Sequence, residues 1–140
     1  MIEFRPFAES DLPLLRTWLG REHVRLWWRE PIEYELAEDM RGRFVILVDG
    51  RPAGMIQSYD AEVDLLIGEE ELTGQGLGPQ VLSQFAREVV FARPGTNACV
   101  ATVEEGNRRS WRAFEKAGFR HVRDVEEEGR PHRLMRLDRG

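Results

Sequence analysis

Hydrophobic and polar residues alternate at the start of the chain and then change to helical spacing. In residues 2–7, apolar Ile2 and Phe4 are separated by charged residues, which is the two-residue period of a strand. Four apolar residues then recur with helical spacing, and Ser10 before them is a residue type that caps helices: Leu12, Leu15, Trp18 and Leu19. The pattern predicts a strand followed by a helix. Two further helices are predicted, one over residues 21–28 and a shorter one around 33–40.

Three apolar runs in the middle of the chain predict strands. The runs at 44–48 and 52–59 flank Asp49-Gly50, and such a pair favours a β-hairpin because its turn needs residues that tolerate positive φ. Residues 62–67 are a third strand, apolar on both faces apart from Asp64. We therefore expect this strand to be largely buried.

The second half repeats the change between helical and strand patterns. A helix is expected after Gly78, with Pro79 at its first position and one apolar stripe: Val81, Leu82, Phe85 and Val89. A strand at 98–103 follows. Asn107 is the expected N-cap of a helix that ends at Gly118. The inward face of this helix contains Trp111, Phe114 and Ala117.

The last two strands, 119–125 and 130–137, surround a Glu128-Gly129 turn. The complete element order, β-α-α-ββ-β-α-β-α-β-β, predicts an α/β (α+β) protein whose mixed central sheet is flanked by helices. We expect one domain over residues 1–140.

Composition narrows the class of protein. The chain is 41% hydrophobic and 32% charged, with a formal net charge of −5, which argues against a nucleic-acid partner. It has neither a signal-like N-terminus nor an apolar run of about 20 residues, so no membrane partner is expected. The single Cys99 excludes an internal disulfide and is expected to be a small core residue. These features predict a cytoplasmic protein; the oligomeric state stays open.

The most informative stretch is Thr73-Gly74-Gln75-Gly76-Leu77-Gly78, between the strand at 62–67 and a helix. Alternating glycines allow tight turns that point successive N–H groups at one place, and the following helix N-terminus adds positive potential. This combination suits a pyrophosphate. The alternative is a glycine-rich turn that only leads into the helix. His23, His121 and His132 lack metal-ligand spacing, so no metal is expected.

This order of strand, glycine loop, long helix, strand and helix resembles the GNAT acetyltransferase superfamily. Within it the chain is most similar to the aminoglycoside 6′-N-acetyltransferases. The resemblance is carried by Phe4-Arg5-Pro6, His23-Val24-Arg25-Leu26-Trp27-Trp28, Gln57-Ser58-Tyr59, Val63-Asp64-Leu65-Leu66-Ile67-Gly68-Glu69 through Gly78, and Phe114-Glu115-Lys116-Ala117-Gly118-Phe119. It implies the GNAT fold and transfer of an acetyl group from acetyl-CoA to an amine.

The resemblance also implies the residues that hold acetyl-CoA. They are Leu66, Ile67, Thr73, Gly74, Gln75, Gly76, Leu77, Gly78, Pro79, Asn107 and Ser110. Backbone N–H groups near Ile67 would polarise the thioester carbonyl. Two positions depart from the superfamily: Thr73 replaces the usual Arg or Gln, and Phe114 replaces a tyrosine thought to protonate the thiolate. Water, the substrate ammonium or Ser110 would then supply that proton or hydrogen bond.

Asp64 is the candidate general base. A carboxylate on a buried strand needs a partner or a purpose, and burial would raise its pKa above about 3.9. The matching aspartate of the resembled family has this role. The alternative is that Asp64 faces solvent or pairs with an arginine.

The candidate acceptor site contains Trp27, Trp28, Tyr59 and Asp60. Aromatic faces attract ammonium groups and cover sugar rings. A Trp-Trp pair at a helix end is also typical of a core, so we expect one ring inward and one toward the site. Glu62 and the run Glu69-Glu70-Glu71 either attract a polycation or form a solvated face. Arg108, Arg109 and Arg112 either contact cofactor phosphates or are solvated.

Three functions stay open at this point. The first is acetylation of a small polycationic amine, an aminoglycoside 6′-amine, with antibiotic resistance or modification of another polyamine as its purpose. The second changes the acceptor to a siderophore hydroxylysine or a protein N-terminus. The third is a coenzyme A-binding module with little catalysis.

Overall fold

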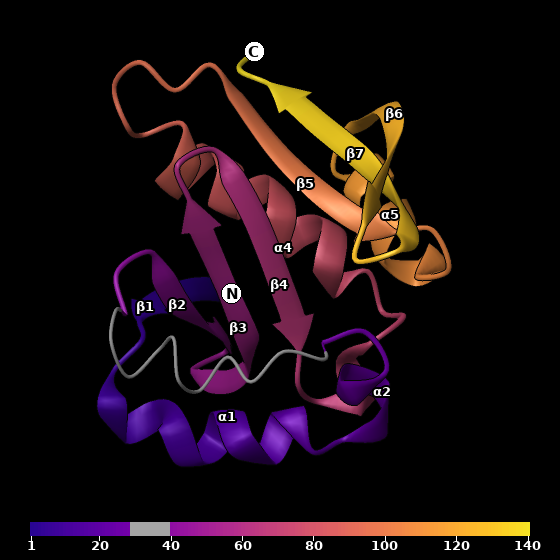
Figure 1. The fold of residues 1–140 in the computed structure, drawn as a ribbon. Coiled ribbons are helices and arrows are strands. Elements are labelled where there is room, and N and C mark those ends of the chain that lie inside the picture. The colour runs from indigo at the N-terminus through magenta and orange to yellow at the C-terminus, as the bar shows by residue number, and fades with distance from the viewer. Residues whose placement is uncertain (29–39) are drawn as a thin grey trace. The chain divides into compact units, whose positions relative to one another are not determined.

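A computed structural model describes residues 1–28 and 40–140. Its strands form a mixed sheet in the order β1-β2-β3-β4-β5-β7-β6 (Figure 1). The strands are β1 (Ile2–Pro6), β2 (Arg43–Val48), β3 (Arg51–Tyr59), β4 (Glu62–Ile67), β5 (Ala98–Glu104), β6 (Arg120–Glu127) and β7 (Arg130–Asp138). The helices are α1 (Leu12–Leu19), α2 (Glu22–Arg25), α4 (Leu77–Phe85) and α5 (Arg108–Lys116), with short turns η1 (Glu9–Asp11) and η2 (Glu70–Leu72) and the π-helical η3 (Ala86–Val90). The predicted mixed sheet and element order are confirmed.

The chain divides into two compact units, which are described in turn. Unit 1 comprises residues 1–57 and 64–73, and unit 2 comprises residues 58–63 and 74–140. Of the predicted helix at 33–40, residues 33–39 lie outside the described residues, and Met40 is not helical.

Unit 1 contains the antiparallel strands β1, β2 and most of β3. Asp49 and Gly50 adopt φ of 51° and 80°, so the predicted Asp-Gly hairpin turn is confirmed. One apolar face of α1 packs into the core of this unit, where Leu15 and Trp18 are fully buried. The core is completed by Phe7, Val24, Val45, Met55 and Leu66.

The predicted Ser10 cap of the first helix is wrong. The turn η1 precedes α1, whose N-cap is Asp11 without a side-chain cap bond among the described residues. The Asp11 carboxylate instead accepts both guanidinium N–H groups of Arg5 at 2.9 Å and the Ala8 N–H at 2.9 Å. These bonds lower the pKa of Asp11 below its usual value, and the bonding to Arg5 has the largest effect.

Unit 2 contains β5, β7 and β6 as antiparallel neighbours. The start of β4 joins them through one parallel pair, Glu62 opposite Val100. Cys99 on β5 is fully buried, which confirms it as a core residue, and burial raises the pKa of its thiol to about 12.

The helix after the glycine loop differs from its prediction at both ends. It begins at Leu77, so Pro79 occupies the third helical position and the first-position prediction is wrong. Phe85 is buried as expected, but Val90 is fully buried and Val89 only partly. The π-helical turn η3 explains this shift, because its wider turn moves the buried stripe by one residue.

The last helix ends as predicted, at Gly118. Gly118 has φ of 102° and its N–H donates to the Glu115 carbonyl, while the Phe119 N–H donates to the Phe114 carbonyl. These are the two bonds of a Schellman motif, and the expected apolar contact is an edge-to-face pair of Phe114 and Phe119 with ring centroids 5.0 Å apart.

Trp111 on the same helix is not the core residue that its spacing predicts. Its ring is only partly buried, lies 3.8 Å from the Arg133 guanidinium and donates its N–H to the Glu105 carbonyl at 3.0 Å. Arg133 in turn makes two bonds to the Glu105 carboxylate, at 2.7 and 2.9 Å. A cation and a carboxylate therefore cover a face that periodicity alone assigns to the core.

We expect Asp11→Asn to lower the free energy of unfolding by about 1–2 kcal/mol at pH 7, because it weakens a charge-assisted pair with Arg5. The pKa of Asp11 is lowered in the folded state, so its contribution is complete above the unfolded value of about 3.9 and disappears as pH falls through the folded value. Urea denaturation at pH 7 and pH 3 measures this difference. Asp49→Asn is the control, since the ion pair of Asp49 with the N-terminus is exposed; equal losses in both variants would contradict the prediction.

Candidate functional site

Asp64 lies on β4, whose end belongs to unit 1. Its side chain is exposed, so the predicted burial is wrong, and its Oδ1 accepts the Leu65 N–H at 2.9 Å. Asp64 and Leu66 share a face of the strand, but only Leu66 packs against the core of unit 1. Glu62 lies on this same face and is also exposed, so only the end of the face, at Leu66, is covered by the core.

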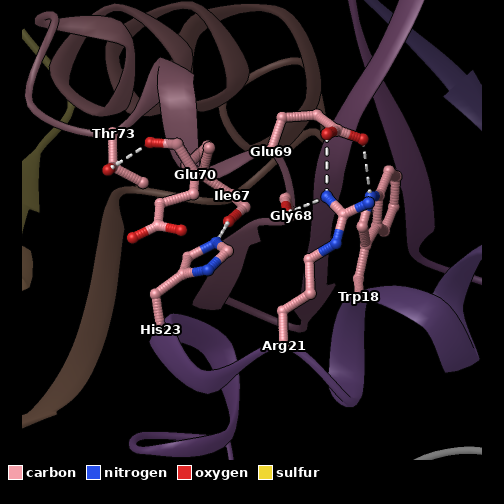
Figure 2. A network of polar contacts seen from close by, with 8 residues as sticks. All are labelled: Trp18, Arg21, His23, Ile67, Gly68, Glu69, Glu70 and Thr73. Carbon is pink, nitrogen blue, oxygen red and sulfur yellow. Dashed lines mark hydrogen bonds and ion pairs between the residues drawn. The ribbon is translucent and has the colours of Figure 1, made fainter.

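The end of β4 is surrounded by polar contacts from residues 18–23 (Figure 2). The Glu69 carboxylate accepts the Arg21 guanidinium at 2.7 Å and the Trp18 ring N–H at 3.1 Å. Arg21 also donates to the Gly68 carbonyl at 2.8 Å, and His23 Nε2 lies 2.9 Å from the Ile67 carbonyl. Hydrogen bonding from Arg21, followed by that from Trp18, lowers the pKa of Glu69.

Sequence reasoning missed this network. It found no metal-ligand spacing at His23 and gave it no contact, and it placed Glu69 in an acidic run, whereas Glu69 is partly buried and paired. Glu70 and Glu71 are exposed. The one available signal was that Arg21, His23, Gly68 and Glu69 lie in or beside the segments that carry the family resemblance.

Two glycines allow close packing at this place. A Cβ on Gly68 would come within 2.2 Å of the Trp18 ring, and one on Gly54 would come within 2.1 Å of the Leu66 carbonyl oxygen. Neither position accepts a side chain without movement of its neighbour. The last residues of β4 are therefore held between β3 and Trp18.

The glycine loop has a backbone suited to an anion. Gly74 and Gly76 both adopt φ of 77°, and a Cβ at either would meet no atom of the described residues within 4 Å. Gly76 is the N-cap residue of α4, and no described side chain caps that helix end. The first N–H groups of α4 are therefore not satisfied by a side-chain cap, and the loop fits a pyrophosphate.

The remaining loop residues have different environments. The Leu77 side chain is buried, so only its backbone serves the loop, while Gln75 is exposed. A Cβ on Gly78 would lie 3.3 Å from Ala113 Cβ, which shows the close approach of α4 to α5. Thr73, at the end of unit 1, donates its hydroxyl to the Glu70 carbonyl at 2.6 Å.

The start of α5 carries the other predicted cofactor residues of unit 2. Asn107 is the N-cap residue and its carbonyl accepts the N–H groups of Ser110 and Trp111, but its side chain makes no cap bond to the described residues. Phe114 is 1% exposed. It is a core residue, as its helical spacing predicts. The nearby arginines 108, 109 and 112 are exposed.

The predicted acceptor residues divide between the two units. In unit 1, Trp28 packs against the core and Trp27 is 40% exposed, so the expected inward ring is Trp28. In unit 2, Tyr59 is 49% exposed. Asp60 is also exposed, with φ of 50°, and its carbonyl accepts bonds from Ser58 and Arg93.

Within residues 1–28 and 40–140, no three His, Cys, Asp or Glu side chains are grouped so that they could hold a metal ion. No helix in the same part of the chain has the length and apolar character needed to cross a membrane.

Comparison with known proteins agrees with the family resemblance of the sequence. A family model described as an acetyltransferase (GNAT) domain matches residues 8–127. Aminoglycoside N(6′)-acetyltransferases type 1 of Klebsiella pneumoniae and Serratia marcescens are each 25% identical, over 84% of this chain and 73% of theirs.

Solved structures agree with the sequence matches. The structure of aminoglycoside acetyltransferase AAC(6′)-Ib with coenzyme A and kanamycin superposes with a TM-score of 0.87 at 25% identity, covering 99% of this chain and 95% of that one. Spermidine N-acetyltransferase from Vibrio cholerae has a TM-score of 0.80 at 17% identity, over 98% and 95% of the two chains, and so shares the fold.

Proposed function

Because the chain belongs to the GNAT acetyltransferase family and is an acetyl-CoA-dependent N-acetyltransferase, we propose that its acceptor is the 6′-amine of an aminoglycoside. The observation that carries this proposal is the match of 84% of the chain to two aminoglycoside 6′-N-acetyltransferases. The family, its fold and acetyl-CoA as donor agree with the expectations from the sequence.

The glycine loop of unit 2 is proposed to hold the pyrophosphate of acetyl-CoA. Positive φ at Gly74 and Gly76 and the open space beside them allow a phosphate to approach the backbone closely. Thr73, Gln75, Leu77, Gly78 and Pro79 complete the proposed loop site, while Asn107 and Ser110 on α5 and Leu66 and Ile67 on β4 are proposed to contact the rest of the cofactor. Bound acetyl-CoA supplies an activated acetyl group as a thioester.

Asp64 is proposed to accept the proton of the acceptor ammonium. Its carboxylate is exposed to solvent, and removal of the proton would leave the nitrogen lone pair free to attack the thioester carbonyl. Backbone N–H groups at the end of β4 near Ile67 would stabilise the oxyanion. Buried Phe114 has no proton to donate, so the departing thiolate takes one from water or from the acceptor nitrogen.

A polycationic acceptor suits the exposed side chains of both units. In unit 1, Asp64 and Glu70 are exposed carboxylates and Trp27 is an exposed aromatic ring; in unit 2, Asp60 and Tyr59 have the same properties. Carboxylates attract ammonium groups over several ångströms, and aromatic rings contact both ammonium groups and sugar rings. Each unit by itself therefore offers the kinds of side chain that bind a charged sugar, whereas a linear polyamine has no ring for the aromatic side chains to cover.

Thiol release from acetyl-CoA tests the acceptor. We expect turnover with kanamycin, which has a free 6′-amine, and at least about tenfold lower kcat/KM with spermidine, hydroxylysine or a short peptide, because only kanamycin engages both charge and ring contacts. An analogue with a 6′-hydroxyl is the matched control. Higher kcat/KM with spermidine would replace the aminoglycoside proposal, and coenzyme A binding without turnover of any amine would favour a binding module.

Asp64→Asn tests the general base. We expect kcat to fall by about 10²–10⁴-fold, because the amide cannot accept the ammonium proton. The thermal midpoint should change little, since the side chain is exposed. Glu62→Gln removes the same charge two residues earlier on the same face of β4; it should alter KM for the acceptor but not kcat. An equal loss of kcat in both variants would assign the effect to charge alone.

Gly76→Ala tests the loop against a turn with matched strain. Gly76 and Gly129 have φ of 77° and 75°, and an added Cβ at either would meet no described atom within 4 Å, so alanine strains both backbones equally. Only at Gly76 would the methyl group meet a bound phosphate, and calorimetry should show at least about tenfold weaker acetyl-CoA binding. Unchanged affinity in Gly76→Ala, or the same loss in Gly129→Ala, would rule out this loop as the phosphate site.

A further inference from the structure

Two side chains at the start of α2 bind successive backbone carbonyls at the end of β4 (Figure 2). His23, on α2, contacts the Ile67 carbonyl at 2.9 Å, and Arg21, the residue before α2, donates to the Gly68 carbonyl at 2.8 Å. Such pairing is not needed for strand formation, because backbone partners normally satisfy these carbonyls. All of these residues belong to unit 1.

Each of the two peptide groups is held on both sides. In the group that joins Ile67 to Gly68, His23 contacts the carbonyl oxygen while the Gly68 N–H donates to the Ala53 carbonyl at 2.8 Å. In the next group, Arg21 binds the Gly68 carbonyl while the Glu69 N–H donates to the same Ala53 oxygen at 3.3 Å. A peptide group is planar, so bonds on both edges restrict its rotation.

The chemistry of His23 is defined by its acceptor. A carbonyl oxygen has no proton, so Nε2 of His23 must carry the hydrogen of this bond. Removing the ring leaves the Ile67 carbonyl without this donor, and the peptide group can then rotate toward another partner. The Arg21 bond is supported separately, because Glu69 holds the same guanidinium at 2.7 Å.

We propose that His23 and Arg21 are positioning residues for acetyl transfer, which hold the end of β4 in the geometry that receives the thioester. The inference rests on the proposed role of the backbone near Ile67. The N–H groups of the two held peptide groups already donate to Ala53, so the proposed oxyanion donor is an N–H that precedes them on β4, and fixing these peptide groups fixes the strand end that carries it. Oxyanion donors stabilise the transition state only if they are already oriented, so movement of the strand end lowers the rate without removing the site.

The variants are His23→Leu, which removes the donor at similar volume, and His23→Gln, whose amide N–H can replace Nε2–H. Arg25→Ala, on an exposed position of the same helix, is the control. We expect His23→Leu to lower kcat about 10–100-fold with KM for the acceptor within about twofold, and His23→Gln to recover most of that loss. Arg21→Met should lower kcat in the same way.

A spectroscopic measurement separates positioning from mere stability. The infrared band of carbonyl-labelled acetyl-CoA bound to the wild-type protein is expected below that of the free thioester, because oriented donors polarise the carbonyl. In His23→Leu the band should return toward the free value, and it should stay at the wild-type position in Arg25→Ala. A lower thermal midpoint with unchanged band and unchanged kcat per folded molecule would overturn the inference.

The same measurement distinguishes the two proposals. If the wild type acetylates no aminoglycoside, the proposed acceptor fails, but the carbonyl band of bound acetyl-CoA can still be compared between wild type and His23→Leu. A band shift that depends on His23 then supports the positioning role alone. Aminoglycoside turnover with a band that is the same in wild type and His23→Leu rejects the positioning role and leaves the acceptor intact.

Discussion

Close packing of Gly68 against the ring of Trp18 constrains the part of unit 1 on which the proposed chemistry depends. The ring is fully buried, and a Cβ at Gly68 would overlap it at 2.2 Å. With the indole in this place, its N–H reaches Glu69 at 3.1 Å, and Glu69 then holds the Arg21 guanidinium. The chain after β4 therefore leaves the strand along a defined path, because burial of a large ring and a charge-assisted bond act on adjacent residues.

Glycine is needed in the loop for a different reason from that at the end of β4. Gly68 lacks a side chain because the space is filled, whereas Gly74 and Gly76 lie in open space and need positive φ. The first kind of glycine permits packing, and the second leaves room for a ligand. Both kinds occur within nine positions of the chain, between a strand that supplies the proposed base and a helix that supplies N–H groups.

Most of the secondary structure could be predicted because its signals are local. The Asp49-Gly50 turn and the Gly118 end of α5 depend on the φ that individual residues tolerate, and β4 was predicted with its observed bounds. The errors have longer-range causes. Trp111 has the spacing of a core residue, but Arg133 and Glu105 from other elements cover it. Val90 replaces Val89 in the buried stripe because a π-helical turn changes the phase.

The sequence by itself determined the element order, the glycine loop and the family, because these depend on periodicity, backbone preference and motifs in a fixed order. Tertiary structure decided which side chains surround the strand end. Arg21 and Glu69 are 48 residues apart in sequence, and no local pattern reports their contact. The exposure of Asp64 was decided in the same way, since the core covers Leu66 on that face of β4 but not Asp64. Burial depends on what packs against a residue, which periodicity does not contain.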